Sequence, residues 1–191
     1  MLMSENTQVQ RTKAAVLQAA RELLLEIGPA ELTYTAVATR SNVTRQTVYR
    51  HWPTRETLLT DIVLTGPDVA YPSPGADAGT VIIEFLHSLR AGMNDGPTGA
   101  ALMALAGQAH HDPISAAALT AISDDRRKAL NVLLAPSGRP ISESEFAQLC
   151  GPVMFQRFIA HRHVTDELIN STVNAWLTQH DEEPNGETDL A

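Results

Sequence analysis

Residues 41–52 read SNVTRQTVYRHW and place cations beside hydroxyl, amide and phenol groups. Arg45 and Gln46 are the side-chain types that hydrogen-bond base edges in the major groove, and Arg50 is suited to phosphate. Many short helices on protein surfaces also carry arginine, threonine and glutamine. The stretch therefore has two interpretations: a helix that lies in a groove of DNA, or a short amphipathic helix with a solvated polar face.

The residues around this stretch predict two short helices joined by a tight turn. Thr33 is placed to cap the first of them and Thr44 the second. Asn42 lies where the chain must turn, and asparagine is one of the few residues besides glycine that tolerates a positive φ. Pro53 ends the second helix. The pair spans about 33–52 and matches a helix-turn-helix.

Two flanking helices complete the predicted unit. Residues 11–27 carry apolar side chains at helical spacing and are followed by Gly28 and Pro29. Thr54 is placed to cap a further helix, whose apolar face is Leu58, Leu59, Ile62 and Val63. In the recognition segment, Val43, Val48 and Trp52 would face this core, which leaves the first turn exposed. A recognition helix presents this turn to the major groove. The predicted DNA contacts are Thr33, Thr44, Arg45, Gln46, Thr47, Tyr49, Arg50, His51 and Arg55.

The charge is uneven along the chain. The formal net charge is −8, yet residues 1–64 hold seven Lys or Arg against six Asp or Glu, a net of +1. Residues 65–191 hold seven against sixteen, a net of −9. Within 33–56, four arginines face a single acid. Screening over about 8–10 Å hides distant charges, so an acidic chain can still present a local basic patch to phosphates.

Composition predicts an all-α protein in a reducing compartment. Of the 191 residues, 43% are hydrophobic and only 5% aromatic, and alanine and leucine are abundant, which favours helices. The lone Cys150 has no partner for an internal disulfide. We find no signal peptide and no apolar run long enough to span a membrane, so we expect a cytoplasmic protein without a membrane partner.

The N-terminal segments resemble the TetR family of transcriptional regulators. The resemblance is strongest over residues 14–59, in VLQAARELLLEIG and LTYTAVATRSNVTRQTVYRHWPTRETLL. The chain departs from the family pattern at Asn42, where glycine is usual, at Trp52, where phenylalanine is common, at Arg55, where a phosphate-contacting lysine is common, and at Ala36, where an acid is common. Gln46, often a small residue in the family, would add a base contact. The resemblance implies a helix-turn-helix domain followed by a helical domain that dimerises and binds a small effector.

The remaining chain is expected to be helical as well. Residues 66–76 contain two glycines and three prolines and indicate a boundary. Helices are predicted at about 77–93, 98–110, 113–135, 142–163 and 165–180. We therefore expect a DNA-binding domain at 1–65, a ligand-binding and dimerisation domain at 66–180, and an acidic disordered tail at 181–191.

The last two helices have broad apolar faces. An extra face suggests a symmetric four-helix interface, because a dimer reads two half-sites where one recognition helix reads too few bases. The alternative is that both faces are buried within one chain. The predicted interface residues are Phe146, Leu149, Val153, Ile159, Ile169, Val173 and Trp176.

The family topology also implies an effector pocket for a small apolar or amphipathic molecule. The candidate lining residues are Phe85, Leu89, Met93, Leu102, Met103, His110, Met154 and Phe158, although core packing is the commoner role for each alone. Neither His110-His111 nor His161-x-His163 has the i, i+4 spacing of a helical zinc site, so we expect no metal and no cofactor.

With these patterns, the resemblance implies a homodimeric repressor that binds an inverted-repeat operator and is released by an effector. One alternative is a DNA-binding or architectural protein that does not switch. Another is an enzyme in a helical bundle, but the chain shows no convincing nucleophile, acid–base pair or metal set. An activator would make similar DNA contacts.

Overall fold

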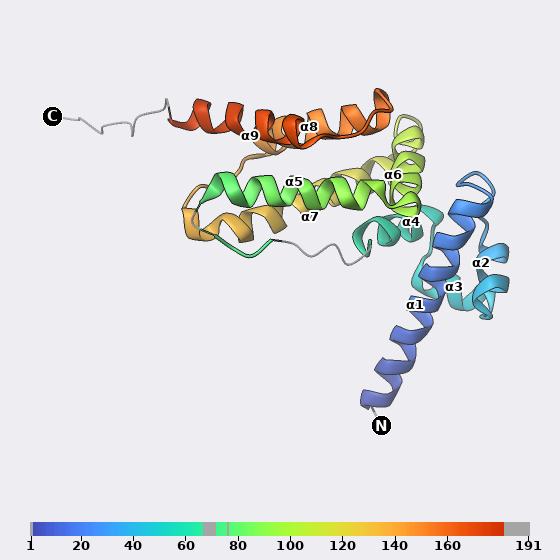
Figure 1. Ribbon diagram of the computed structural model, residues 1–191. Coiled ribbons are helices and arrows are strands. Elements are labelled where there is room, and N and C mark those ends of the chain that lie inside the picture. The colour runs from blue at the N-terminus through green and yellow to red at the C-terminus, as the bar shows by residue number, and fades with distance from the viewer. Residues whose placement is uncertain (1, 67–71, 76, 182–191) are drawn as a thin grey trace. The chain divides into compact units, whose positions relative to one another are not determined.

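The computed structural model describes residues 2–66, 72–75 and 77–181, and within them it contains helices and no strand (Figure 1). Residues 182–191, most of the predicted tail, lie outside the described residues. The elements are α1 (Leu2–Glu26), α2 (Tyr34–Ser41), α3 (Arg45–His51), α4 (Arg55–Leu64), α5 (Ala78–Asn94), α6 (Gly96–Gln108), α7 (Pro113–Leu134), the 3-10 turn η1 (Ala135–Ser137), α8 (Glu143–Met154), the π-helical turn η2 (Phe155–Ile159) and α9 (Asp166–Asp181).

The described residues form two compact units. Unit 1 comprises 2–66 and 92–124, and unit 2 comprises 72–91 and 125–181. Unit 1 therefore contains α6 and the first half of α7 in addition to α1–α4. The division falls inside α5 and α7, whereas the sequence suggested a boundary in the loop that follows α4.

The caps predicted for α2, α3 and α4 are all present. Thr33 accepts a hydrogen bond from Ala36 N at 3.2 Å, and Thr44 accepts one from Thr47 N at 3.1 Å. Thr54 forms a capping box with the third residue of α4. Asn42 has φ 54° and ψ 41°, the left-handed conformation predicted for the turn. Local side-chain chemistry thus defines where these helices begin and how the turn closes.

Unit 1 has one apolar core that draws on every helix within it. The predicted apolar face of α4 is fully buried, together with Val48 and Trp52 of the α3 region. Ala101 and Leu105 of α6 and Ile122 of α7 belong to the same cluster. In Figure 1, α2 and α3 lie against the C-terminal half of α1. The contribution of α6 to this core explains why it belongs to unit 1.

Unit 2 packs α5, the end of α7, α8 and α9 together. Phe85 of α5 and Phe146 of α8 are buried, with ring centroids 6.2 Å apart. In the same first turn of α8, the Glu145 carboxylate accepts hydrogen bonds from Trp176 Nε1 at 3.2 Å and His180 Nε2 at 2.5 Å, both on α9. Burial acts to raise the pKa of Glu145, but its hydrogen bonds from Ser142, His180 and Trp176 hold it below its usual value of 4.5.

Two helix ends differ from the prediction. The first helix begins at Leu2 instead of residue 11, because residues 2–10 contain no glycine or proline to stop it. The α-helix expected over 142–163 ends at Met154, and the chain goes on as the π-helical turn η2. The last hydrogen bond of this turn runs from Ala160 N to Phe155 O at 2.9 Å. Pro152 has no amide hydrogen, so one backbone hydrogen bond of α8 is missing. His161, with a φ of 52°, then turns the chain away from the helical direction.

Candidate nucleic-acid interface

The first turn of α3 forms a polar, outward-facing surface. Thr44, Arg45 and Gln46 are exposed, and Thr47 is half-buried. The Thr44 and Thr47 hydroxyls lie 2.9 Å apart, so they are already paired with each other. Arg45 and Gln46 are therefore the side chains best placed to reach an external partner, and both types bond base edges bidentately.

The opposite side of α3 is held firmly. Val48 is fully buried, and Trp52 caps the helix with its ring in the core. Trp52 Nε1 donates to Asp61 Oδ2 of α4 at 2.7 Å, and the Tyr34 hydroxyl of α2 donates to the Trp52 carbonyl at 2.6 Å. These bonds tie α3 to the helices on either side of it, so its exposed turn has a fixed direction.

Tyr49 lies on the exposed side of α3, and its ring packs against that of Tyr34. The rings of Tyr34 and Tyr49 meet edge to face, with centroids 4.4 Å apart. Burial, with the nearby Glu56 charge, raises the pKa of Tyr34 to about 12, which keeps its hydroxyl a donor. Tyr49 itself is 45% exposed and is suited to a phosphate contact.

The remaining predicted contacts lie in unit 1 around α3, but they are not equally free. Arg50 is exposed, whereas the His51 ring packs against the Trp52 ring, with centroids 5.7 Å apart. Thr33 is exposed, with its hydroxyl used as the α2 cap. Arg55 is half-buried and donates to the Pro29 carbonyl, so part of its guanidinium is committed inside the protein.

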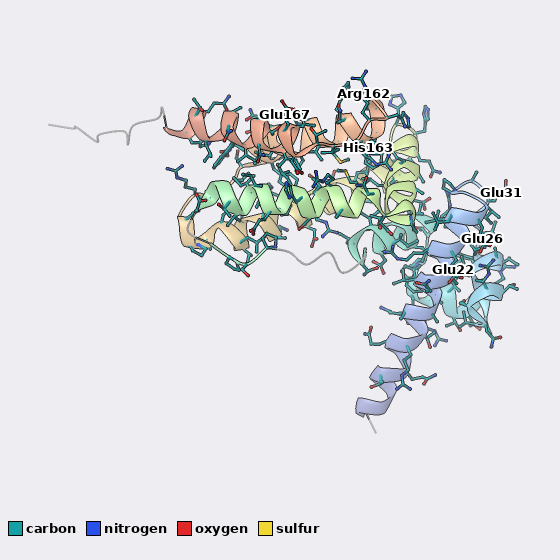
Figure 2. The ribbon with its side chains drawn as sticks, in the orientation of Figure 1. Glu22, Glu26, Glu31, Arg162, His163 and Glu167 are labelled. Carbon is teal, nitrogen blue, oxygen red and sulfur yellow. The ribbon has the colours of Figure 1, made fainter. Side chains whose placement is uncertain are left out.

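Arg40 does not add to the basic surface. It bonds Glu26 through both terminal nitrogens, at 2.8 and 2.6 Å, and Glu22 at 3.3 Å. Glu22 and Glu26 lie on the last turns of α1 (Figure 2). The hydrogen bond from Arg40 lowers the pKa of Glu26. The four arginines counted in the sequence therefore become a smaller patch centred on Arg45 and Arg50.

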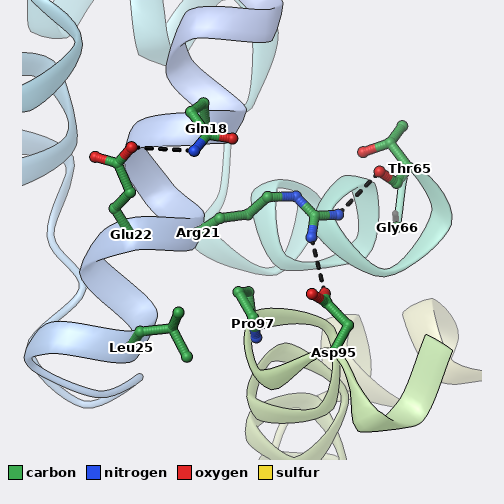
Figure 3. Close-up of a pocket in the computed structure, with 8 residues that line it drawn as sticks. All are labelled: Gln18, Arg21, Glu22, Leu25, Thr65, Gly66, Asp95 and Pro97. Carbon is green, nitrogen blue, oxygen red and sulfur yellow. Dashed lines mark hydrogen bonds and ion pairs between the residues drawn. The ribbon is translucent and has the colours of Figure 1, made fainter. Parts of the chain in front are cut away.

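A cleft of about 400 Å³ in unit 1 was not predicted from the sequence. Its lining residues come from α1, the end of α4 and the start of α6 (Figure 3): Gln18, Arg21, Glu22, Leu25, Thr65, Gly66, Asp95 and Pro97. None of them is among the predicted pocket residues. Of those, Phe85, Leu89, Met154 and Phe158 lie in unit 2, and Met93, Leu102, Met103 and His110 lie in unit 1. Phe85 and Met93 are buried, and His110 is exposed.

Most residues predicted for the dimer interface pack inside unit 2. Ile159 is 68% exposed, and the other six are buried in the single chain: Phe146, Leu149, Val153, Ile169, Val173 and Trp176. A buried side chain offers little surface to a partner. This burial is what the alternative interpretation, packing within one chain, expects of these six residues.

A different set of small and apolar residues remains exposed on α8 and η2. Ala147, Gly151, Phe155 and Ile159 recur every fourth residue, and all four are exposed. Phe155 is 58% exposed and Ile159 68%. We call these four residues the α8–η2 face. Exposed apolar side chains gathered in one stretch of the chain are typical of surfaces that associate with another apolar surface.

The described histidines and the cysteine form no metal or redox site. No group of three or more His, Cys, Asp or Glu in this part of the chain is arranged to hold a metal ion. His163, labelled with Arg162 and Glu167 in Figure 2, is exposed in the turn before α9. Cys150 is buried, and burial raises its pKa to about 12, so its thiol stays protonated and unreactive.

Comparisons with known proteins agree with this geometry. Residues 16–62 match the family model described as bacterial regulatory proteins, tetR family. The solved structure of the TetR family transcription regulator SCO0332 is 29% identical, with a TM-score of 0.70 over 87% of this chain and 97% of that one. No curated protein sequence matches the chain.

Two further solved structures share the fold at 18% identity. A TetR transcriptional regulator from Agrobacterium tumefaciens has a TM-score of 0.63 and covers 88% of this chain and 94% of its own. A multidrug binding protein, EbrR, solved in complex with imidazole, has a TM-score of 0.56, and the match covers 85% of this chain and 93% of EbrR.

The capped helix pair, the exposed first turn of α3 and the buried opposite side define a helix-turn-helix DNA-binding protein. The family match covers this same segment, and the likeness to SCO0332 extends along most of the chain. The chain is therefore similar to the DNA-binding transcriptional regulators of the TetR family, and residues 16–62 carry that family's DNA-binding segment. No helix in its described residues is long and apolar enough to cross a membrane.

Proposed function

We propose that this regulator is a homodimeric repressor that binds an inverted-repeat operator and leaves it when a small effector binds. The observation that carries the proposal is the exposed first turn of α3, where Arg45 and Gln46 project from a helix fixed by its cap and by Trp52. One such turn reads only a few base pairs. Two copies related by a two-fold axis read two half-sites and reach useful specificity.

The α8–η2 face is the proposed dimer interface. Its side chains are exposed and apolar in the single chain, and a two-fold contact would cover the same patch on both copies. The interface is therefore assigned to Ala147, Gly151, Phe155 and Ile159 instead of the buried residues on the other side of the same helices. A dimer of this kind acts on chromosomal DNA, so we place it in the cytoplasm.

The effector is proposed to be a small apolar or amphipathic molecule. The family resemblance supports this, as does the description of EbrR as a multidrug binding protein. An effector that fits one arrangement of the helices better than another lowers operator affinity through a coupling of about 1–3 kcal/mol.

A selection from fragmented genomic DNA tests the DNA-binding part. The purified protein is incubated with fragments of its source genome at about 150 mM salt, where nonspecific phosphate binding is weak. We expect enrichment of a few inverted-repeat sites with wild-type protein and none with the Arg45→Ala, Gln46→Ala double variant. A folded wild-type protein that enriches no site would overturn the proposal.

A thermal-shift screen separates a switching regulator from one that does not switch. A ligand that binds the folded state raises the unfolding temperature by mass action. We expect at least one apolar or amphipathic compound to do so and to release the selected operator. Compounds that stabilise the protein without releasing DNA would favour the non-switching alternative, and operator-dependent stimulation of transcription would identify an activator.

A further inference from the structure

Arg21 of α1 bonds two other helices at once (Figure 3). Its Nη1 donates to Asp95 Oδ2 at 3.1 Å and to Thr98 Oγ1 at 3.4 Å, at the start of α6. Its Nη2 donates to the carbonyls of Ile62 at 2.6 Å and Thr65 at 2.9 Å, at the end of α4. One planar guanidinium therefore fixes the last turn of α4 to the first turn of α6. We call these five residues the Arg21 clamp.

Two residues of the clamp, Asp95 and Thr65, also cap their helices. Asp95 is the N-cap of α6 and accepts from Thr98 N at 3.2 Å, while Thr65 is the C-cap of α4. Carbonyls at a helix end have no partner within their own helix, so Arg21 satisfies two acceptors that α4 cannot. Each terminal nitrogen donates hydrogen bonds to one helix. A lysine has a single nitrogen and cannot bond both helices in this planar, forked geometry.

The clamp is partly removed from water. The Arg21 side chain is 14% exposed and that of Asp95 24%, in contrast to 36% and 52% for Arg40 and Glu26. Removing one partner of a half-buried pair leaves the other charge poorly solvated, whereas an exposed pair is replaced by water at little cost. The two ion pairs share α1 and the same chemistry, so the exposed pair is a matched control for the clamp.

The end of α4 is connected to the recognition helix. Only Trp52, Pro53 and Thr54 separate α3 from α4. Trp52 Nε1 bonds Asp61, which directly precedes Ile62 and lies one turn before Thr65. Arg21 thus holds the C-terminal end of α4. From the same part of α4, Asp61 binds Trp52, the C-cap of α3. Hydrogen bonds, together with the backbone between Asp61 and Ile62, therefore connect the start of α6 to the end of α3.

We infer that Arg21 and Asp95 are positioning residues for DNA binding: the clamp sets the direction of α4 and, through Asp61 and Trp52, the direction of the α3 turn that meets the operator. Neither residue lies on α3. The inference rests on the proposed function, because it takes α3 as the reading helix. It adds that operator affinity depends on a contact made by the first turn of α6.

The test compares Asp95→Asn with Glu26→Gln on the selected operator. Asparagine is as good an N-cap as aspartate, so Asp95→Asn preserves the start of α6 and removes only the charge that holds Arg21. We expect operator affinity, measured by fluorescence anisotropy well below the unfolding temperature, to fall about tenfold for Asp95→Asn and less than about twofold for Glu26→Gln. Arg21→Lys is expected to match Asp95→Asn.

A double-mutant cycle separates positioning from general stability. If Arg21 acts through α4 and Trp52, then Arg21→Gln weakens operator binding less in a Trp52→Phe background, where the bond to Asp61 is already absent. Two results would overturn the role of the clamp but not the proposed function. One is a loss of operator affinity that is additive in the double variant. The other is unchanged operator affinity of Asp95→Asn while the wild-type protein binds its operator. A wild-type protein that selects no DNA site overturns the proposed function and this inference with it.

Discussion

The first turn of α3 and the α8–η2 face are both left uncovered by their own units, but they expose opposite chemistry. The first presents Thr44, Arg45 and Gln46, and the second presents Phe155 and Ile159 with two small residues. Polar groups on a fixed helix suit a partner with many donors and acceptors, such as a base-pair edge. Aligned apolar groups suit a partner that excludes water, such as a second copy of the same face.

The two surfaces also differ in how they are supported. The α3 turn is directed by hydrogen bonds from Tyr34 and to Asp61, so its side chains begin from a fixed backbone. The α8–η2 face crosses from an α-helix into a π-turn at Met154. Specific DNA reading needs the fixed geometry, whereas apolar association depends chiefly on the area covered. Changing each surface separately should therefore affect different measurements.

The largest effect is expected from charging the α8–η2 face. Phe155→Glu with Ile159→Glu places two acids per chain in the proposed interface, so we expect monomers in sedimentation velocity. Operator affinity should then fall more than about 100-fold, because each monomer reads one half-site. Val132→Glu on α7 is the matched control, since Val132 is 67% exposed and lies outside this face. Dimers that survive the double change would place the interface elsewhere.

Removing the reading side chains should spare the dimer. A bidentate base contact contributes about 1–3 kcal/mol, so Arg45→Ala with Gln46→Ala should lower operator affinity about 100-fold or more. Sedimentation and the unfolding temperature should not change, because both side chains are exposed. Lys128→Ala, an exposed cation in unit 2, should bind as wild type. Undiminished operator binding by the double variant would refute the role given to α3.

The turn before α3 offers a smaller and local test. A non-glycine residue at positive φ costs about 1–2 kcal/mol, and asparagine is among the residues that bear it best. At Asn42, with φ 54°, we expect alanine to destabilise the chain by about 1 kcal/mol and glycine to be nearly neutral in thermal unfolding. Equal stability of the alanine and glycine variants would mean that the turn relaxes.

The smallest effect is expected from Glu145, which joins α8 to α9. Its folded pKa lies below the unfolded value of 4.5, so its stabilising contribution is fully present above about pH 4.5 and is lost as the pH falls through the folded pKa. Glu145→Gln should therefore lower stability slightly near neutral pH and reduce the loss of stability in acid. Parallel acid-denaturation curves for the two proteins would contradict this.

The elements that the sequence predicted well are those determined by neighbouring residues. Thr33, Asn42, Thr44 and Thr54 act on backbone groups within four positions, so the caps and the turn could be read from spacing alone. The same holds for the apolar face of α4. Most helix bounds followed from the same local signals.

The features that the sequence did not reveal depend on partners far along the chain. Arg21 bonds Asp95, 74 residues away, and its own segment looks like any polar helix side. Arg40 is removed from the basic patch by Glu22 and Glu26 of a different helix. Periodicity showed that α8 and α9 are apolar, but it could not say which side the unit itself would bury.

The most direct test of the central claim is to change the spacing of the two half-sites. About five base pairs, half a helical turn, are inserted at the centre of a selected inverted repeat, and wild-type affinity is measured against the natural site at about 150 mM salt. A dimer that holds two α3 helices at one separation predicts a loss of at least about 100-fold, to the level of a single half-site. Equal affinity for both sites would contradict the account, because it would mean that each α3 binds alone.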